Sequence, residues 1–184
     1  PTDDPAALDQ AVRARYQEFD SVPSAQLEAA AAVVALEKIG PSVLVTNSAG
    51  GFRALLTALK SDNIRGIVAY ENPGFVFPRS ANIDVPEGPF GPVYVSDEEF
   101  ARLTRIPMQF VWGDNLNRSA VWAPLVALNR EFVKLVNMRG GKAEIVMLPD
   151  VGLRGNTHIP FADLNNEEVA QQLFSWMEQH QLVK

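Results

Sequence analysis

The chain has 184 residues, a length that fits one domain or a large part of one. Hydrophobic residues make up 47% and charged residues 21%, which is typical of globular proteins and excludes a disordered or collagen-like chain. The net charge is −6 and no basic cluster is present, so nucleic-acid binding is not expected. The lack of Cys excludes disulfides and cysteine nucleophiles, and no apolar run reaches the roughly 18 residues of a membrane span.

Two helices are expected before the first strand. Residues 5–19 carry apolar side chains at helical spacing, with Asp4 as the cap. Residues 24–39 form the second predicted helix, which is capped by Ser24 and stopped by Gly40. Its inward face is predicted to consist of small and aliphatic residues, namely Leu27, Ala30, Ala31, Val34 and Ala35.

Four short apolar runs predict strands, at residues 41–46, Ile64–Tyr70, Met108–Trp112 and residues 143–148. Helical patterns separate or follow them, at residues 52–60, 120–138 and 167–179. Because strands that alternate with helices form parallel sheets, the sequence predicts an α/β fold with a parallel sheet and helices on both faces.

A Pro- and Gly-rich segment, residues 72–107, joins the second and third predicted strands. A connection of this length usually has a function, and we expect it to cover a pocket. Within it, Asp97–Leu103 predicts a short helix capped by Ser96 or Asp97. Its aromatic residues either wall an apolar pocket or simply pack over the sheet; they are Phe75, Phe77, Phe90 and Tyr94.

Ser48 lies in the turn between the first predicted strand and the next helix, within Thr-Asn-Ser-Ala-Gly-Gly. A Ser in such a sharp turn can be a nucleophile, and its neighbours two positions away must be small. Gly50 fits this requirement, whereas Thr46 replaces the usual Gly. The backbone N–H groups at the start of the helix, beginning with Ala49, can stabilise an oxyanion. The alternatives are that Ser48 only caps the helix or that the turn binds phosphate.

His158 lies in the loop between the last strand and the last helix, and the only other histidine, His180, is near the C-terminus. Loops that follow parallel strands gather at the carboxyl ends of those strands, where Ser48 also lies. His158 can therefore act as a general base for Ser48. The alternative is an exposed loop histidine without a catalytic role.

Two acids are candidates for orienting His158. Glu71 directly follows the second strand, and Asp114 follows the third strand. Either one can also be an ordinary turn or capping residue. Asp150 and Asp163 are weaker candidates, and we expect both to be turn or capping residues.

Together these residues resemble the α/β-hydrolase superfamily, in which nucleophile, acid and His follow in this order. The Trp112-Gly113-Asp114 segment and the Gly-x-x-His loop at residues 155–158 are also similar to it. The resemblance covers nearly the whole chain but only the C-terminal half of that fold, from the nucleophile strand onward. It implies that the first strands of the fold are missing from this chain and that residues 1–184 are the C-terminal part of one domain, with residues 1–40 as the preceding helices.

The usual acid of the superfamily lies three residues after the Gly of the Trp-Gly segment, where this chain has Leu116. The pattern Tyr-Glu-Asn-Pro-Gly around Glu71, with Gly-Asn-Thr-His-Ile-Pro-Phe around His158, resembles a smaller group of bacterial esterases with a Ser-Glu-His triad. The resemblance thus implies Ser48, Glu71 and His158 as the triad, with Asp114 as the alternative acid.

The resemblance further implies a serine esterase that cleaves small carboxylic esters through an acyl-enzyme, with neither metal nor cofactor. Ala49 would supply one oxyanion N–H, and a companion N-terminal fragment of the same polypeptide would supply the other. An acyltransferase or lactonase would use the same triad. A non-catalytic binding module or a degenerate hydrolase is the alternative from another class. The resemblance is to bacterial proteins, and it leaves a homodimer and a periplasmic or secreted location open.

Overall fold

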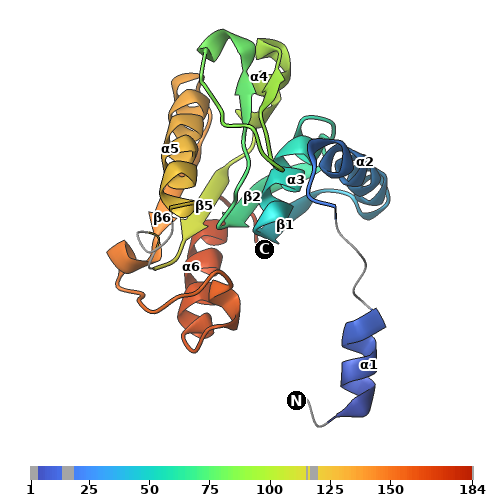
Figure 1. Ribbon diagram of the computed structural model, residues 1–184, viewed down its shortest axis with the longest axis vertical. Coiled ribbons are helices and arrows are strands. Elements are labelled where there is room, and N and C mark those ends of the chain that lie inside the picture. Colours follow the sequence, from blue (N-terminus) through green and yellow to red (C-terminus); the bar gives the residue numbers. More distant parts are fainter. Residues whose placement is uncertain (1–3, 14–18, 115, 117–119, 184) are drawn as a thin grey trace.

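A four-stranded parallel sheet forms the centre of the computed structural model, which describes residues 4–13, 19–114, 116 and 120–183 (Figure 1). The strand order is β1-β2-β5-β6. These strands are β1 (Ser42–Asn47), β2 (Ile64–Tyr70), β5 (Met108–Trp112) and β6 (Ala143–Met147). The predicted parallel α/β architecture is confirmed, and the bounds of β2 and β5 agree with the sequence patterns.

The strand register brings the carboxyl ends of three strands to one edge of the sheet. Asn47 at the end of β1 pairs with Tyr70 at the end of β2, and Tyr70 pairs with Val111 of β5. Residues that directly follow these strands therefore meet at a common edge, as expected for an open parallel sheet.

Helices cover both faces of the sheet. The chain begins with α1 (Pro5–Arg13) and α2 (Val22–Ile39), and continues with α3 (Ala49–Ala58), α5 (Trp122–Met138) and α6 (Asn166–Gln179). Figure 1 shows α1 apart from the rest of the fold. Single 3-10 turns occupy Arg79–Ala81, Leu148–Val151 and Pro160–Ala162.

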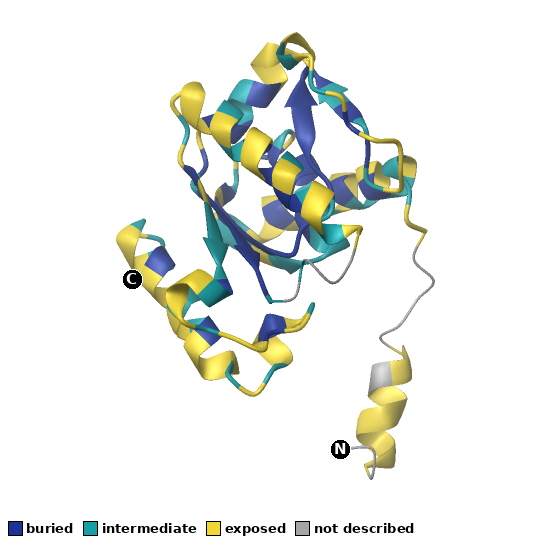
Figure 2. Cartoon of the chain, turned by 60° about the vertical axis from the view of Figure 1, so that its left-hand side comes forward, coloured by how far each residue is buried: buried dark blue, intermediate teal, exposed yellow. Residues whose placement is uncertain are grey.

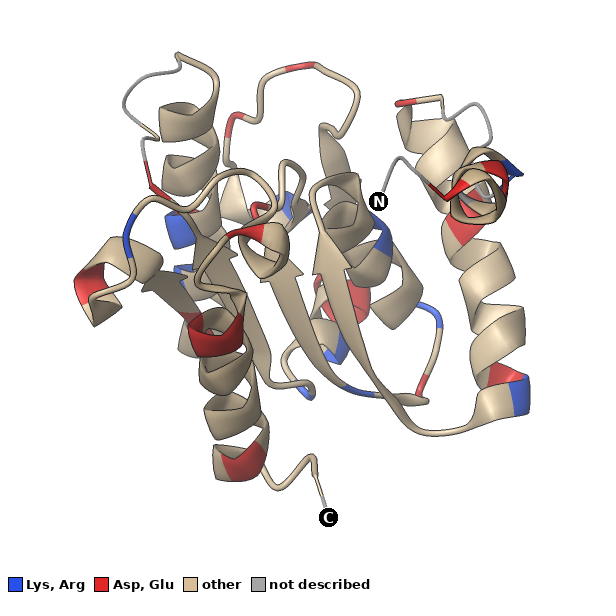
Figure 3. Cartoon of the chain, turned by 90° about the horizontal axis from the view of Figure 1, so that it is seen from below, with Lys and Arg blue, Asp and Glu red and all other residues tan. Residues whose placement is uncertain are grey.

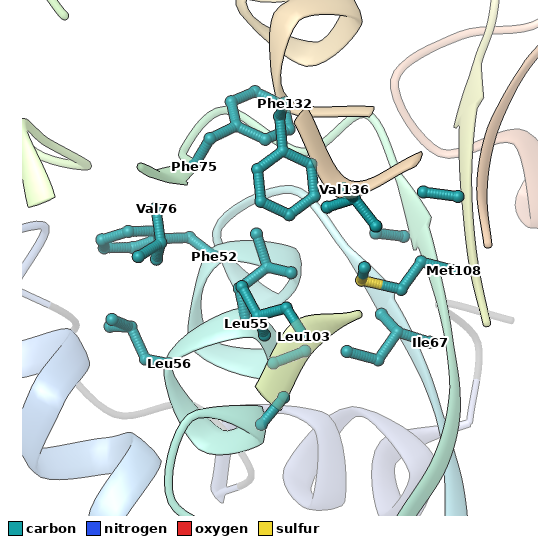
Figure 4. Close-up of a cluster of buried hydrophobic side chains, with 14 of the residues drawn as sticks. Phe52, Leu55, Leu56, Ile67, Phe75, Val76, Leu103, Met108, Phe132 and Val136 are labelled. Carbon is teal, nitrogen blue, oxygen red and sulfur yellow. The ribbon is translucent and has the colours of Figure 1, made fainter. Parts of the chain in front are cut away.

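The two faces have separate hydrophobic cores because side chains alternate along the strands. Ile67 of β2 joins the larger core, which α3 and α5 cover with residues such as Phe52, Leu55 and Phe132 (Figure 4). The adjacent residue, Val68, points to the opposite face and joins a smaller core, which includes Val169 and Trp176 of α6. Figure 2 shows buried and half-buried strands and exposed outer sides of the helices; the central strands β2 and β5 are the most buried, whereas β1 and β6 are mostly half-buried.

The expected face of the second helix is wrong. The helix begins one turn earlier, with Ser21 as its cap, and the Ser21 hydroxyl accepts a hydrogen bond from Ser24 N. Its buried side consists of Ala25, Ala29 and Leu36, while the predicted inward residues Leu27, Ala30, Ala31, Val34 and Ala35 are exposed. Apolar residues occur all around this helix, so periodicity alone does not identify the side that packs.

The segment at residues 72–107 is more regular than expected. The short helix α4 (Asp97–Leu103) is confirmed, with Ser96 as its cap in a capping box with Glu99. Two short strands, β3 (Val76–Pro78) and β4 (Val93–Val95), form a separate parallel pair that the sequence analysis did not predict. Strands of three residues are too short to show the alternation of apolar and polar side chains that identifies a strand. The neighbouring prolines, moreover, favoured the prediction of a loop.

Charged residues of both signs are interspersed over the elements (Figure 3). Asp97 at the start of α4 accepts hydrogen bonds from Ser80 and from Arg139 beyond α5. The Ser80 hydroxyl and, to a smaller extent, the Arg139 guanidinium lower the pKa of the Asp97 carboxyl. No helix in the described part of the chain combines the length and the apolar character that crossing a membrane requires.

Phe132 lies at the centre of the larger core. Its ring packs against those of Phe75, Phe77, Phe100 and Phe110, with centroid separations of 5.5–6.2 Å. These partners come from the segments around β3, α4 and β5, so this one side chain of α5 joins three parts of the fold.

We expect Phe132→Ala to lower the free energy of unfolding by about 3–5 kcal/mol, because it opens a cavity at a fully buried aromatic cluster. The matched control is Phe174→Ala, which truncates an exposed ring on α6 and should change stability by about 0.5 kcal/mol or less. Urea denaturation measures both variants. Equal losses would contradict the assignment of Phe132 as the centre of the core.

Candidate active site

Ser48 occupies a sharp turn between β1 and α3. Its backbone has φ 51° and ψ −132°, a conformation that is costly for a residue with a Cβ atom. Two hydrogen bonds hold the turn: Ser48 N donates to Tyr70 O at 2.8 Å, and Gly51 N donates to Ser48 O at 2.9 Å. A strained, well-anchored Ser at a strand-to-helix turn is the geometry of a nucleophile elbow.

Thr46 and Gly50 lie close together in this turn. A Cβ atom added to Gly50 would lie 3.4 Å from Thr46 Cβ, which is an ordinary van der Waals contact, so Thr46 fits here without a clash. The Thr46 hydroxyl donates a hydrogen bond to Val68 O across the strand pair. The departure from the usual Gly thus leaves the turn intact.

Glu71 and His158 form a hydrogen-bonded pair at the same edge of the sheet. Glu71 follows β2 with φ 48°, and the residue is only 3% exposed. Its Oε2 lies 2.8 Å from His158 Nδ1, while its Oε1 accepts a hydrogen bond from Gly113 N at 2.9 Å. Both carboxylate oxygens therefore have partners, and the carboxylate plane is fixed relative to the imidazole.

Gly113 is required for the approach of this carboxylate. A Cβ atom at Gly113 would lie 2.9 Å from Glu71 Oε1 and 3.1 Å from Thr157 O. The end of β5 therefore contributes a backbone N–H donor and open space, which together let the Glu71 side chain and the loop of His158 pack closely.

The loop that carries His158 is held by side chains from its own C-terminal part. Asp163 accepts two hydrogen bonds from Thr157, one from N at 2.7 Å and one from Oγ1 at 2.9 Å. Asn156, which is 2% exposed, exchanges two amide hydrogen bonds with Asn165. These contacts fix the backbone directly before His158.

Asp114 serves this loop rather than the imidazole. Its Oδ2 accepts a hydrogen bond from Gly155 N, and its own N donates to Asn156 O at 3.3 Å. The structure thus brings Glu71, and not Asp114, to the His158 ring. Leu116, at the usual position of the superfamily's acid, packs at the edge of the larger core.

The structure shows no hydrogen bond between Ser48 Oγ and His158 among the described contacts. Ser48 instead shares a cavity wall with Trp122, and the Trp122 ring lies against the His158 ring, with the two centroids 4.9 Å apart. Nucleophile–base hydrogen bonds are often long or poorly aligned in unliganded sites, so this arrangement is compatible with catalysis.

A cavity of about 860 Å³ opens beside Ser48. Phe75 and Phe90 line it, whereas Phe77 is buried in the core and the Tyr94 hydroxyl donates to Ile83 O. Two of the four expected aromatic residues thus wall the cavity. The rest of the wall is mainly apolar and includes Val85, Trp122, Leu125 and Leu128, with an ion pair between Arg53 and Glu28 at its margin.

Tyr70 supports the His158 loop from within the smaller core. Its ring packs edge-to-face on Phe161, which follows the His158 segment, with centroids 5.8 Å apart. Burial raises the pKa of the Tyr70 phenol to about 12, so this side chain stays neutral at physiological pH.

Sequence reasoning missed two contributors to this site, Trp122 and the backbone N–H of Gly113. Trp122 was placed only within a predicted helix, and the backbone N–H of Gly113 has no signal of its own in the sequence. Asp163 was a weaker candidate for the acid, and it instead holds the loop, as expected of a turn residue. Across the ranges that the structure describes, no three His, Asp or Glu side chains are arranged to hold a metal ion.

Comparison with known proteins finds similarity among solved structures. No protein family and no curated protein matches the sequence. Among solved structures, the chain is similar to the atomic-resolution structure of a novel bacterial esterase, with a TM-score of 0.65 and 26% identity. The match covers 86% of this chain but only 43% of the esterase, so the chain spans less than half of that protein's length. The chain therefore shares an esterase-like α/β fold.

We expect Ser48→Gly to unfold at higher urea concentration than Ser48→Ala, with a difference of about 1 kcal/mol, because glycine adopts the Ser48 backbone angles without Cβ strain. Both variants lack the hydroxyl, so their difference reports the strain at Ser48 less the extra backbone entropy that glycine has in the unfolded chain. Equal stabilities would show that the strain does not exceed this entropy difference.

Proposed function

We propose that this chain carries the catalytic residues of a serine hydrolase that cleaves carboxylic esters through an acyl-enzyme. The observation that carries the proposal is the 2.8 Å contact between Glu71 Oε2 and His158 Nδ1, at the sheet edge where Ser48 occupies a strained turn. The similarity to a bacterial esterase supports the reaction class.

In this mechanism each residue has one task. His158 Nε2 accepts the proton of the Ser48 hydroxyl as Ser48 Oγ bonds to the ester carbonyl carbon. Glu71 holds the His158 tautomer that carries its proton on Nδ1 and stabilises the imidazolium that forms. His158 then protonates the leaving alcohol as the ester C–O bond breaks, and water releases the acid from Ser48 by the reverse sequence.

The oxyanion of the tetrahedral intermediate needs two N–H donors, and the proposal assigns one of them to Ala49, the first residue of α3. We assign the second to a companion N-terminal fragment of the same polypeptide that lies along the outer side of β1. Two observations support this assignment: β1 pairs only with β2 among the described strands, and the similar esterase is more than twice as long as the part that matches.

The substrate class follows from the cavity beside Ser48. Its largely apolar wall favours an ester with an apolar acyl or alcohol group of modest size. An acyltransferase or lactonase would use the same three residues and differ only in the acceptor of the acyl group. A non-catalytic binding module would have no need for the paired Glu71 and His158.

We expect a fluorophosphonate to modify Ser48 in the native protein and p-nitrophenyl butyrate to be hydrolysed. Ser48→Ala should lose the adduct and reduce kcat/KM by about a thousand-fold or more, because the nucleophile is absent. Peptide mapping and the intact mass of the preparation locate the label and show whether a companion fragment is present.

Ser80→Ala is the control. It removes an exposed hydroxyl that bonds to Asp97 of α4 and does not line the cavity, so this variant should retain both label and turnover. A folded preparation that contains both fragments and is not labelled at Ser48, or turnover that survives Ser48→Ala, would refute the proposed hydrolase.

The choice of acid is tested by two isosteric changes. Glu71→Gln should lower kcat by about 10³–10⁴-fold, since the amide no longer favours the required His158 tautomer. Asp114→Asn should change kcat only a few-fold, because the amide oxygen of Asn still accepts the hydrogen bond from Gly155 N. Steady-state kinetics of the purified variants distinguish the two acids. A larger loss of kcat for Asp114→Asn than for Glu71→Gln would identify Asp114 as the acid.

A further inference from the structure

We infer that Trp122 is a positioning residue for His158, a role that rests on the proposed function. The Trp122 ring lies against the imidazole with a centroid separation of 4.9 Å and an interplanar angle of 36°. Trp122 also lines the cavity that contains Ser48, so it stands at the junction between the base and the substrate space.

The Trp122 ring is itself supported from behind. It packs edge-to-face on Trp112, the last residue of β5, with centroids 6.3 Å apart. Trp112 is fully buried, and its indole N–H donates to Asn129 Oδ1 of α5 at 2.8 Å. The sheet and α5 thus hold Trp122 through a fixed second ring, and the position of Trp122 defines a wall for His158.

The contact with Trp122 matters because the hydrogen bond to Glu71 does not by itself fix the orientation of the His158 ring. The hydrogen bond to Glu71 fixes Nδ1, but a contact at one ring atom permits the imidazole to tilt about that point. The His158 side chain is 37% exposed, so it is not enclosed on all sides. The Trp122 ring, which lies against the imidazole at an angle of 36°, opposes the tilt and keeps Nε2 directed as the Ser48 proton transfer requires.

The face of Trp122 also suits the charge that His158 acquires. An indole face attracts a cation, and the imidazolium forms when Ser48 attacks the ester. Glu71, through its contact with Nδ1, and the neighbouring Trp122 ring then both stabilise the same charged state.

The second histidine provides an internal reference for a spectroscopic test. His180 lies against Trp176, with centroids 4.7 Å apart, at the far end of α6. In ¹H NMR of the whole chain, the His158 ring protons should show the ring-current shift of a stacked indole. Trp122→Leu should remove this shift and leave His180 unchanged, with His180→Gln used to assign the two residues.

Kinetics provide the functional test. Trp122→Leu should lower kcat by about 10- to 100-fold with a smaller change in KM, because the base is misplaced while the cavity remains. Trp122→Phe keeps an aromatic face and should restore most of kcat, and it also replaces the Leu variant if that variant fails to fold. Leu125→Ala is the control: it enlarges the same cavity wall and should change KM more than kcat.

The outcomes separate this role from the proposed function. Unmoved His158 resonances in Trp122→Leu, or an unchanged kcat in that variant of an active enzyme, would refute the positioning role alone. A wild-type protein with both fragments present that shows no turnover and no label at Ser48 would refute the proposed function and this role with it, while the NMR comparison would still establish whether the two rings lie together in solution.

Discussion

The strand register that places Asn47, Tyr70 and Val111 side by side is the constraint on which the candidate site depends. Because these strands are parallel, the residues after them leave the sheet in the same direction, and side chains 23 positions apart in sequence become neighbours without a long loop. Ser48 N bonds to Tyr70 O, and Glu71 N bonds to Val111 O. The hydrogen-bond ladder of the sheet thus continues one residue beyond the strands and fixes the two candidate catalytic residues directly.

Both of these residues adopt a positive φ angle, which residues with a Cβ atom rarely do. Each such conformation costs of order 1–3 kcal/mol and persists only where the surroundings determine it. Here the backbone hydrogen bonds of Ser48 N and Glu71 N, the Gly113 N–H and the lack of a side chain at Gly113 hold the two residues in these conformations. The rigid sheet therefore tolerates strained backbone angles at its edge. These angles turn the chain at Ser48 and Glu71 away from the direction of the strands.

Sequence patterns were sufficient where one physical signal dominated. The apolar runs Ile64–Tyr70 and Met108–Trp112 are buried on both faces, so they were predicted with correct bounds. The buried face of α2 was not predicted correctly, because apolar residues surround this helix. Only its contact with α3 determines that Ala25, Ala29 and Leu36 are the buried residues. For the site, the sequence order and a family resemblance suggested Ser48, Glu71 and His158. The contact between the Trp122 and His158 rings depends on how α5 packs against β5, so no local sequence pattern predicts it.

The outer side of β1 has a consequence for the behaviour of the chain in solution. Among the described strands β1 pairs only with β2, and its sequence, Ser-Val-Leu-Val-Thr-Asn, contains neither a charge nor a proline. Proteins ordinarily protect such an edge with lysine, proline or a covering segment, because unpaired N–H and C=O groups accept any compatible strand. The companion fragment proposed above would therefore have a second role: by pairing with β1, it would protect this edge from edge-to-edge aggregation.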